Sequence, residues 1–571
     1  MNPRRFWGRR GERVGCSGES VGTPRQTRDS RITRRRWIAL AFLAVVGAWG
    51  CSSAGDRAGR VSDRAAETTV ATGETLRMAM PTAKIVLDPA AAVPTRQEDM
   101  ILLDLVYDTL TRFDHRNKRV TPALARRWHA SDGFKTWTFE LAPDARFHDG
   151  TPVRPEDVKK SLERLAASRV SLLGARLEVL DGYSDFVAGR AGEIRGIESV
   201  GDSQVVFHTR APYAPLPELL SAPSFGVVPA AGFVEGRSDQ DSTGAVGSGE
   251  DRSAHGPLPV GSGPMKVVEG SETALRLEPA REGVELDAVE IRAEGDLEGS
   301  WRAFREGEVD WAMIPASAVD DVKGEAEAMV VPHVTELWVG MNLTRPELSS
   351  PRLRSAIGFA VDRRRLVSRA LPGAASLEGV IPAGVVGFDP EVCGGECDHD
   401  PERSRELLQA IGDVPSLAFD FDSTPRSRRV ARAVAEDLAD VGLRVELREH
   451  EPSEYRKLFA TRSVQLFLLG WTGVAATPDS YLAPLFASGS VENFVGFANK
   501  GFDDGLAKAR STGDPAERAE LYSKLEAAVV RFAKPVVPIA QNRTLVAVAR
   551  RVRGVDIAPD GTFDVTAVRV R

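Results

Sequence analysis

The sequence has few residues of the kinds that bind metals or act as nucleophiles. Its 571 residues include four cysteines and eight histidines, and the histidines are scattered without the spacing of metal ligands. The zinc-peptidase pattern His-Glu-x-x-His and the phosphate-binding pattern Gly-x-x-x-x-Gly-Lys-Ser/Thr are both absent. Because catalytic triads assemble from distant positions, these absences favour a binding protein without excluding an enzyme. We therefore expect no catalytic residues, no metal and no cofactor.

Long apolar runs are also scarce. The run at residues 37–50 has 14 residues, and no stretch after Cys51 approaches the about 18 residues that a membrane-spanning helix needs. The rest of the composition, 42% hydrophobic and 27% charged, is typical of globular proteins, and the length allows two or three domains.

Basic residues are concentrated at the start of the chain. Residues 1–50 contain 11 arginines against three acidic residues. The remainder contains 63 basic and 78 acidic residues, a net charge of −15. An acidic protein lacks the basic surface that phosphate backbones require, so we expect no nucleic-acid partner.

The early apolar run has the surroundings of an export signal. Arg34–Arg36 precede it, and Gly50 stands directly before Cys51. A charged segment, an apolar segment and a small residue at the processing site make up a secretory signal. With a cysteine at the first mature position, the site resembles the lipobox of bacterial lipoproteins, which implies that Cys51 carries a lipid anchor. Ala48 and Trp49 depart from the usual lipobox, so cleavage elsewhere in a secretory protein is the alternative.

The region around this signal has three expected parts. We predict that residues 1–50 are a signal peptide with an extended N-terminal arm and that residues 51–73 are a flexible tether. Residues 33–38 also resemble the twin-arginine export pattern, and the long arm has a second explanation in a start codon assigned too early. The export route and the true start therefore stay open.

The remaining cysteines form a close pair. Cys16 lies in the predicted arm, which leaves Cys393 and Cys397 in the mature protein. An exported protein favours a small loop-closing disulfide between them. Zinc is the rival interpretation because Asp398 and His399 follow, but one cysteine pair without a second is a weak metal signal.

Predicted helices and strands alternate beyond residue 73. Apolar alternation and buried apolar runs predict strands at residues 75–80, 136–141, 204–208, 416–421, 443–447 and 464–469. Helical spacing and capping residues predict helices at residues 99–110, 155–165, 352–370, 401–411, 428–441 and 515–532. Residues 233–263, rich in Gly, Ser, Asp and Pro, are expected to be a surface insertion. This alternation predicts an α/β protein.

Four groups of motifs follow one another along residues 74–560. They are Trp137-Thr138-Phe139 with Phe147–Pro152, then Gly261–Pro264, then Asn342, Arg354, Asp362 and Asp400-Pro401-Glu402, and last Gly470-Trp471, Pro478-Asp479 and Val537-Pro538. As an ordered set they resemble the extracytoplasmic solute-binding proteins of ABC transporters, family 5, which handle peptides, nickel and related solutes. Read without the resemblance, Trp128, Trp137 and Phe147 are core aromatics rather than ligand contacts.

The resemblance implies a periplasmic-binding-protein-like fold of type II, with two ligand-clasping lobes and an additional third lobe. Mapped onto this chain, lobe I would comprise residues 74–96, 194–331 and 535–571, lobe II residues 97–193, and lobe III residues 332–534. It implies a monomeric, lipid-anchored receptor in the cell envelope, outside the cytoplasm, that captures a small solute by hinge closure. The implied partners are the solute, with peptide the leading class, and ABC permease subunits. The alternatives are a sensor or scaffold lipoprotein of the same fold and, less favoured, a hydrolase.

The resemblance also places one wall of the ligand cleft after a buried strand, at Trp471, Thr472, Gly473, Val474 and Asp479. Trp471 offers a flat surface for a solute, although a core tryptophan is an equal alternative. Peptide binders of the family usually carry an aspartate here that pairs with the α-ammonium of the peptide, and Val474 stands at the nearest matching position. A buried ammonium without a carboxylate costs several kcal/mol. Either Asp479 takes that role or the ligand lacks a free amino terminus.

Overall fold

The computed structural model describes residues 74–230 and 258–571 apart from residues 325, 415 and 475 and the side chain of residue 172. The predicted signal, Cys51, the tether and most of the predicted insertion lie outside these residues. In the part of the chain that is described, no helix combines the length and apolar character needed to cross a membrane.

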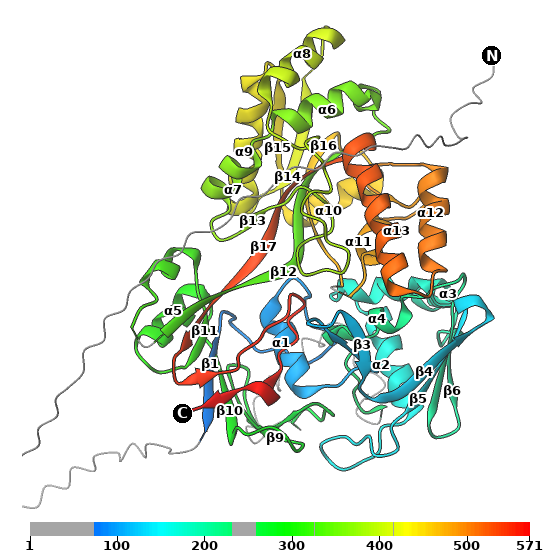
Figure 1. The fold of residues 1–571 in the computed structure, drawn as a ribbon, viewed down its shortest axis with the longest axis vertical. Coiled ribbons are helices and arrows are strands. Elements are labelled where there is room, and N and C mark those ends of the chain that lie inside the picture. The colour runs from blue at the N-terminus through cyan, green and yellow to red at the C-terminus, as the bar shows by residue number, and fades with distance from the viewer. Residues whose placement is uncertain (1–73, 231–257, 325, 415, 475) are drawn as a thin grey trace, which may run out of the picture. The chain divides into compact units, whose positions relative to one another are not determined.

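One large mixed sheet organises most of the described chain (Figure 1). Its strands lie in the order β15-β14-β16-β12-β17-β11-β1-β10-β9-β8, and β13 pairs with β17 off this path. The strands are β1 (Thr75–Met80), β8 (Met265–Gly270), β9 (Ala274–Pro279), β10 (Ala288–Ala293), β11 (Trp311–Met313), β12 (Ala326–Met341), β13 (Ala375–Ser376), β14 (Leu417–Asp422), β15 (Val445–His450), β16 (Leu466–Thr472) and β17 (Val536–Ala549). Strand β1 is parallel to β10 and β11, and β14 is parallel to β15 and β16.

Two long antiparallel strands, β12 and β17, connect the two ends of this sheet (Figure 1). Near Ala326 they adjoin β11, β1 and β10, here called the first half of the sheet, and near Met341 they adjoin β16, β14 and β15, here called the second half. Their regular pairing is interrupted between Pro332 and Glu336. The two halves are therefore joined by a pair of strands whose ladder is weakest where the halves meet.

Helices cover both halves. In the first half, α1 (Gln97–Val106) packs in one core cluster with Met78, and α5 (Leu297–Arg305) lies in another with Ala79. In the second half, α6 (Pro351–Ala360), α7 (Arg363–Ala370) and α9 (Pro425–Asp440) pack with Val339. The opposite core contains Trp338 with α10 (Pro452–Thr461), α11 (Asp479–Phe486), α12 (Lys500–Arg510) and α13 (Pro515–Ala527). Helix α8 (Pro401–Ile411) packs on α6.

A second sheet has the order β4-β5-β7-β6, from β4 (Ala125–Ser131), β5 (Thr136–Leu141), β6 (Ile197–Val200) and β7 (Gln204–His208). Helix α2 (Pro155–Ala167), the hairpin of β2 (Thr111–Asp114) and β3 (Arg119–Pro122), and the short helices α3 (Tyr183–Val187) and α4 (Leu216–Leu219) surround it. Phe139 and Phe207 form its fully buried centre, with their rings edge to face. Residue 193, where the predicted lobe II ends, lies between β5 and β6 of this sheet, and α1, at the start of the predicted lobe II, packs with the first half of the large sheet.

The predicted helix at residues 352–370 is divided in the structure. Helix α6 ends at Ala360 and α7 begins at Arg363, because the side chain of Asp362 accepts a hydrogen bond from Arg365 N and caps a new helix. At the end of the chain, β18 (Val552–Arg553) and β19 (Arg569–Val570) form a small two-stranded sheet.

Candidate functional site

The predicted ligand segment leaves the large sheet at the end of β16. Trp471 and Thr472 still pair with Glu336 and Thr335 of β12. The Thr472 and Thr335 hydroxyl oxygens lie 2.7 Å apart in a hydrogen bond. The segment therefore starts beside the interrupted region of the β12–β17 ladder.

Gly473 and Val474 turn the chain away from the strand by close packing. A Cβ on Gly473 would lie 2.4 Å from the ring of Tyr481, whose hydroxyl donates to Val334 O at 2.7 Å. Val474 N donates to Ser480 Oγ at 2.8 Å, and the Val474 side chain, 1% exposed, belongs to the core of the second sheet. The structure thus gives Val474 a packing role.

Trp471 is half-buried and has fixed neighbours. Its Nε1 donates to Ser480 O at 2.9 Å, which orients the indole ring. The guanidinium carbon of Arg176 lies 5.2 Å from the ring centroid, a cation–π distance, and Arg176 also pairs with Glu492 at 2.5 Å. A solute would thus find one face of this ring already in contact with an arginine.

Asp479 is buried and fully paired. Arg510 binds it in a bidentate fashion, with Nε to Oδ1 at 2.7 Å and Nη2 to Oδ2 at 2.8 Å. The hydroxyls of Tyr522 and Tyr213 donate to the same carboxylate at 2.9 and 3.3 Å. Burial first, and then this carboxylate, raise the pKa of both tyrosines well above its usual value, so both keep their donor protons. A ligand ammonium would have to displace Arg510, so the geometry disfavours Asp479 as its partner.

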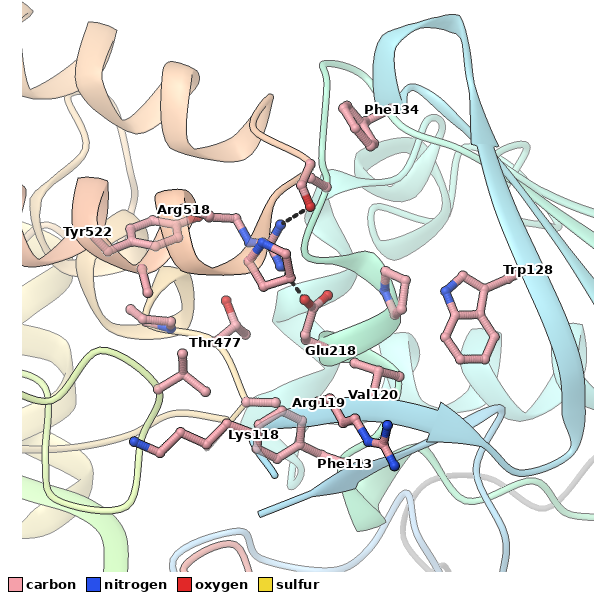
Figure 2. A pocket seen from close by; sticks show the side chains of 18 of the residues that line it. Phe113, Lys118, Arg119, Val120, Trp128, Phe134, Glu218, Thr477, Arg518 and Tyr522 are labelled. Carbon is pink, nitrogen blue, oxygen red and sulfur yellow. Dashed lines mark hydrogen bonds and ion pairs between the residues drawn. The ribbon is translucent and has the colours of Figure 1, made fainter. Parts of the chain in front are cut away.

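The end of the segment borders a cavity of about 290 Å³, shown in Figure 2 and called here the aromatic cavity. Ala476, Thr477 and Pro478 form one side, and Arg518 and Tyr522 of α13 form another. The rest of the wall comes mainly from the hairpin and the second sheet, with Phe113, Lys118, Arg119, Val120, Trp128, Phe134 and Trp137. The cavity therefore lies where the second sheet faces the second half of the large sheet.

An ion pair lies in the wall of the aromatic cavity. Arg518 of α13 forms an ion pair with Glu218 of α4 (Figure 2). Arg518 Nη1 also donates to Thr512 O at 2.9 Å. Burial raises the pKa of Glu218, and the guanidinium opposes that shift. The other lining residues are mainly aromatic and apolar, with the exposed Lys118 and Arg119 among them, so the cavity suits an apolar or aromatic group.

The three aromatic residues predicted to lie in the core differ in burial in the structure. Trp137 and Phe147 are buried, as predicted, and the Trp137 Nε1 donates to Tyr213 O at 3.1 Å. Trp128 is half-buried and lines the aromatic cavity with its indole ring. No sequence signal separates it from Trp137, because both alternate inward on neighbouring strands.

A second cavity, of about 490 Å³, lies between the two halves of the large sheet and is called here the arginine cavity. Pro81, Met313 and Ile314 follow the carboxyl ends of β1 and β11 on one side, and residues 370–374 with Arg426 and Arg429 form the other. Asn542, Arg543 and Thr544 of β17 lie between them. Open α/β sheets bind ligands at the carboxyl ends of their strands, so this cavity is a second candidate binding position, and sequence analysis gave no sign of it.

The cysteine pair lies away from both cavities' lining residues. Cys393 and Cys397 are buried with Cα atoms 5.7 Å apart, a separation that a disulfide requires. In the described ranges, no group of three or more His, Cys, Asp or Glu side chains is placed to hold a metal ion.

Comparison with known proteins gives a consistent result. Residues 119–493 match the family described as bacterial extracellular solute-binding proteins, family 5. The dipeptide-binding protein of Escherichia coli K12 is 24% identical over 484 residues, covering 80% of this chain and 87% of the relative.

Solved structures agree on the fold. The periplasmic murein tripeptide-binding protein MppA, in its unliganded open form, matches with a TM-score of 0.72 and 21% identity, over 88% of this chain and 98% of that one. The ABC transporter substrate-binding protein CtaP of Listeria monocytogenes matches with a TM-score of 0.69 and 21% identity, over 87% and 99% of the two chains.

Proposed function

The chain belongs to the bacterial extracellular solute-binding proteins of family 5, and from this premise we propose that it is the solute receptor of an ABC importer that captures a peptide or similar small solute. The motif-based assignment to this family and to its α/β binding-protein fold is confirmed. Members of the family bind and deliver solutes and catalyse no reaction, so the protein is not an enzyme.

The aromatic cavity is the observation that carries the proposal for the site. It brings residues 476–478 of the predicted segment together with the second sheet and α13, three parts of the chain that are distant in sequence. Its volume suits a single side chain or a small aromatic group, and its aromatic wall would supply most of the contact area. Trp471, Thr472, Gly473, Val474 and Asp479 would support this wall, with Thr472, Gly473 and Asp479 acting through packing and internal hydrogen bonds.

The predicted ligand segment has no free carboxylate for a peptide ammonium, and this bears on the class of solute. Val474 offers no carboxylate, and Asp479 is neutralised by Arg510. We therefore infer a peptide or related solute whose amino terminus is blocked, absent or left in water. Names of relatives support peptide as the class, since those proteins are described as binding a dipeptide and a murein tripeptide.

Capture would proceed by closure of lobes about β12 and β17. The interruption of their ladder near Pro332 provides a place where φ and ψ can change without breaking regular hydrogen bonds. The division into lobe I (74–96, 194–331, 535–571), lobe II (97–193) and lobe III (332–534) belongs to this proposal. Small-angle scattering with and without solute tests it, since closure predicts a smaller radius of gyration, and an unchanged curve at saturating solute would contradict it.

Placement in the cell is a further part of the proposal. Cys51 would carry a lipid that holds an acidic, extracytoplasmic receptor at a membrane near its permease, and Cys393 and Cys397 would form a disulfide after export. Replacement Cys51→Ala is expected to move the protein from the membrane fraction to the soluble fraction, and retention in the membrane would refute the anchor.

The central experiment is native mass spectrometry of the protein isolated from its own host. We expect a co-purifying small solute, and we expect N-acetyl-Ala-Phe to bind at least as tightly as Ala-Phe in titration calorimetry. A strong preference for the free amine would overturn the solute class. Failure of every peptide, together with no co-purifying solute, would overturn the receptor function itself.

A further inference from the structure

The arginine cavity has an unusual charge. Its wall contains four arginines, Arg96, Arg426, Arg429 and Arg543, and one carboxylate, Glu98. Arg96 is neutralised, because its Nε lies 3.1 Å from Glu98 and its Nη2 lies 3.2 Å from Asp99. The excess positive charge therefore belongs to the other three arginines.

These three arginines contact neutral acceptors. Arg426 Nη2 donates to Asn542 Oδ1 at 2.5 Å, and Arg429 Nε donates to Ala370 O at 3.3 Å. Arg543 donates through Nε to Gly373 O at 2.7 Å and through Nη2 to Ala374 O at 2.9 Å. Each contact leaves further N–H groups of the guanidinium unused, since an arginine carries five donors.

Elsewhere in the described residues, buried or half-buried arginines commonly meet carboxylates. Arg77 and Arg551 share Asp310, for example, and Arg112 pairs with Asp104. No ion pair with a carboxylate is found for Arg426, Arg429 or Arg543 among the residues that the structure describes. Arg354 and Arg363 also bind carbonyl oxygens alone, so the lack of a carboxylate does not by itself single out the three. What they share is one cavity wall, on which Arg426 is half-buried and Arg429 and Arg543 are exposed.

The local electrostatics favour an incoming anion. Burial lowers the pKa of Arg426, the neighbouring Arg429 lowers it further, and Asp422 opposes the shift only in part. An anion between these two guanidinium groups would remove their mutual repulsion. A guanidinium group can donate two parallel hydrogen bonds to the oxygen pair of a carboxylate or phosphate. An oxyanion therefore gains two hydrogen bonds from each arginine that binds it in a bidentate fashion.

The remaining wall defines the rest of such a ligand. Leu297, Met313, Ile314, Leu371 and Leu545 supply carbon surface next to the arginines. A bare ion would leave this surface and most of the 490 Å³ without a partner. We propose that the arginine cavity binds a small organic oxyanion, a carboxylate or a phosphate ester, with its charge against Arg426, Arg429 and Arg543 and its carbon body against these apolar side chains.

The proposal stands on the cavity and goes beyond the receptor function. Two sources share this chemistry. The anion is either the acidic end of the captured solute or a separate molecule that lies against β17 and shifts the balance between open and closed lobes.

Binding is tested by calorimetry on the purified protein with N-acetyl-leucine, phenyl phosphate and inorganic phosphate as probes, and with neutral N-acetyl-leucine amide as the matched control. We expect an acidic organic probe to bind, the amide to bind at least tenfold more weakly, and inorganic phosphate to bind more weakly than phenyl phosphate. Absence of binding by all acidic probes, or equal binding of N-acetyl-leucine and its amide, would overturn the proposal.

Variants locate the site. The double replacement Arg426→Gln and Arg429→Gln is expected to weaken the acidic probe at least tenfold. Arg428→Gln, on the same helix but paired with Glu449 at 2.6 Å, removes one positive charge where the double variant removes two, and it is expected to alter binding less than twofold. Arg426→Lys keeps the positive charge and removes the bidentate guanidinium, so it replaces the double variant if that variant folds poorly. Its affinity for the acidic probe should lie between those of the double variant and the Arg428→Gln control. Equal losses in the Arg428→Gln control would refute the assignment.

Competition separates the two sources. If the acidic probe displaces the co-purifying solute, the arginines bind the acidic end of that solute. If both bind together, the anion is a separate ligand. Peptide binding that survives in the arginine variants leaves the receptor function intact even where the anion site fails, so the two proposals fail independently.

Discussion

The two cavities treat charge in opposite ways. In and beside the aromatic cavity, the buried carboxylates of Glu218 and Asp479 each have a cationic partner within the protein, Arg518 and Arg510. In the arginine cavity, Arg426 and Arg429 contact only neutral acceptors. A charged residue beside a cavity therefore points to a ligand when the protein supplies no counter-charge for it. Asp479 lies in the predicted ligand segment, but Arg510 pairs with it, so its role is to stabilise the fold.

Among the variants that test this comparison, Asp479→Asn is expected to change stability most. It leaves the half-buried guanidinium of Arg510 without a counter-charge, so we expect the free energy of unfolding to fall by about 3–5 kcal/mol. Urea unfolding measures it. Asp504→Asn, which breaks the exposed pair of Asp504 with Lys500, serves as the control and should change little. If Asp479→Asn were as mild as the control and sharpened binding of free-amine peptides, Asp479 would be a ligand group after all.

A second test concerns a buried acid with no cation. Burial raises the pKa of the Glu526 carboxyl to about 8, although its Oε1 accepts hydrogen bonds from Val380 N and Ile381 N at 2.7 and 2.8 Å. The unfolded state keeps an ordinary pKa near 4.5, so the unfolded chain releases this proton first and stability falls as pH rises from about 4.5 to about 8. Glu526→Gln should remove that part of the pH dependence, and relative to the native protein it should gain about 2–5 kcal/mol between pH 5 and pH 9.

Urea unfolding of both proteins at several pH values measures this difference. Glu520→Gln, an exposed position on the same helix that pairs with Lys524, is the control, and its profile should run parallel to that of the native protein. Parallel profiles for Glu526→Gln as well would mean that the carboxyl is ionised in the fold.

Third is Gly473→Ala, which tests whether the predicted segment is held by packing. The added Cβ would press on the Tyr481 ring, so we expect a loss of about 1–3 kcal/mol in the free energy of unfolding. Gly358→Ala, in α6 with no atom within 4 Å of the added Cβ, is expected to be neutral or slightly stabilising. Equal effects at the two positions would show that the segment adapts freely.

The smallest expected effect on stability comes from Trp128→Ala. This half-buried indole borders the aromatic cavity, so its removal should cost about 1 kcal/mol of stability yet lower the retained solute severalfold in native mass spectra. Phe532→Ala, at a position 77% exposed, is the control for loss of an aromatic ring. Unchanged retention in Trp128→Ala would move the solute site away from the aromatic cavity.

Much of the fold was predictable because local signals and burial agree. The predicted strand at residues 136–141 coincides with β5, and the predicted helix at residues 401–411 coincides with α8. Alternation alone specifies β5, since Trp137 and Phe139 both point inward. The helix predicted over residues 352–370 is wrong in its continuity, because the capping role of Asp362 depends on the backbone turn and not on apolar spacing.

The site was much less predictable. The family resemblance pointed to Trp471–Val474 and Asp479, and none of these lines the aromatic cavity, which residues 476–478 between them border. Nor could it identify the partners of Asp479, because Arg510, Tyr522 and Tyr213 come from separate elements. The arginine cavity carries no motif for the same reason. Arg426 lies on α9 and Arg543 on β17, and only the folded sheet brings them to one wall.

The course of β12 and β17 also constrains the order in which the large sheet can form during synthesis. The chain leaves the first half of the sheet along β12, builds the whole second half, and returns along β17, so the second half is a single excursion between two paired strands. Strand β11 receives its second neighbour only when residues 546–548 arrive. During synthesis the first half therefore waits for nearly the entire chain, a non-local closure that is intrinsically slow. The delay makes truncation near the carboxyl end costly to the part of the molecule that is made first.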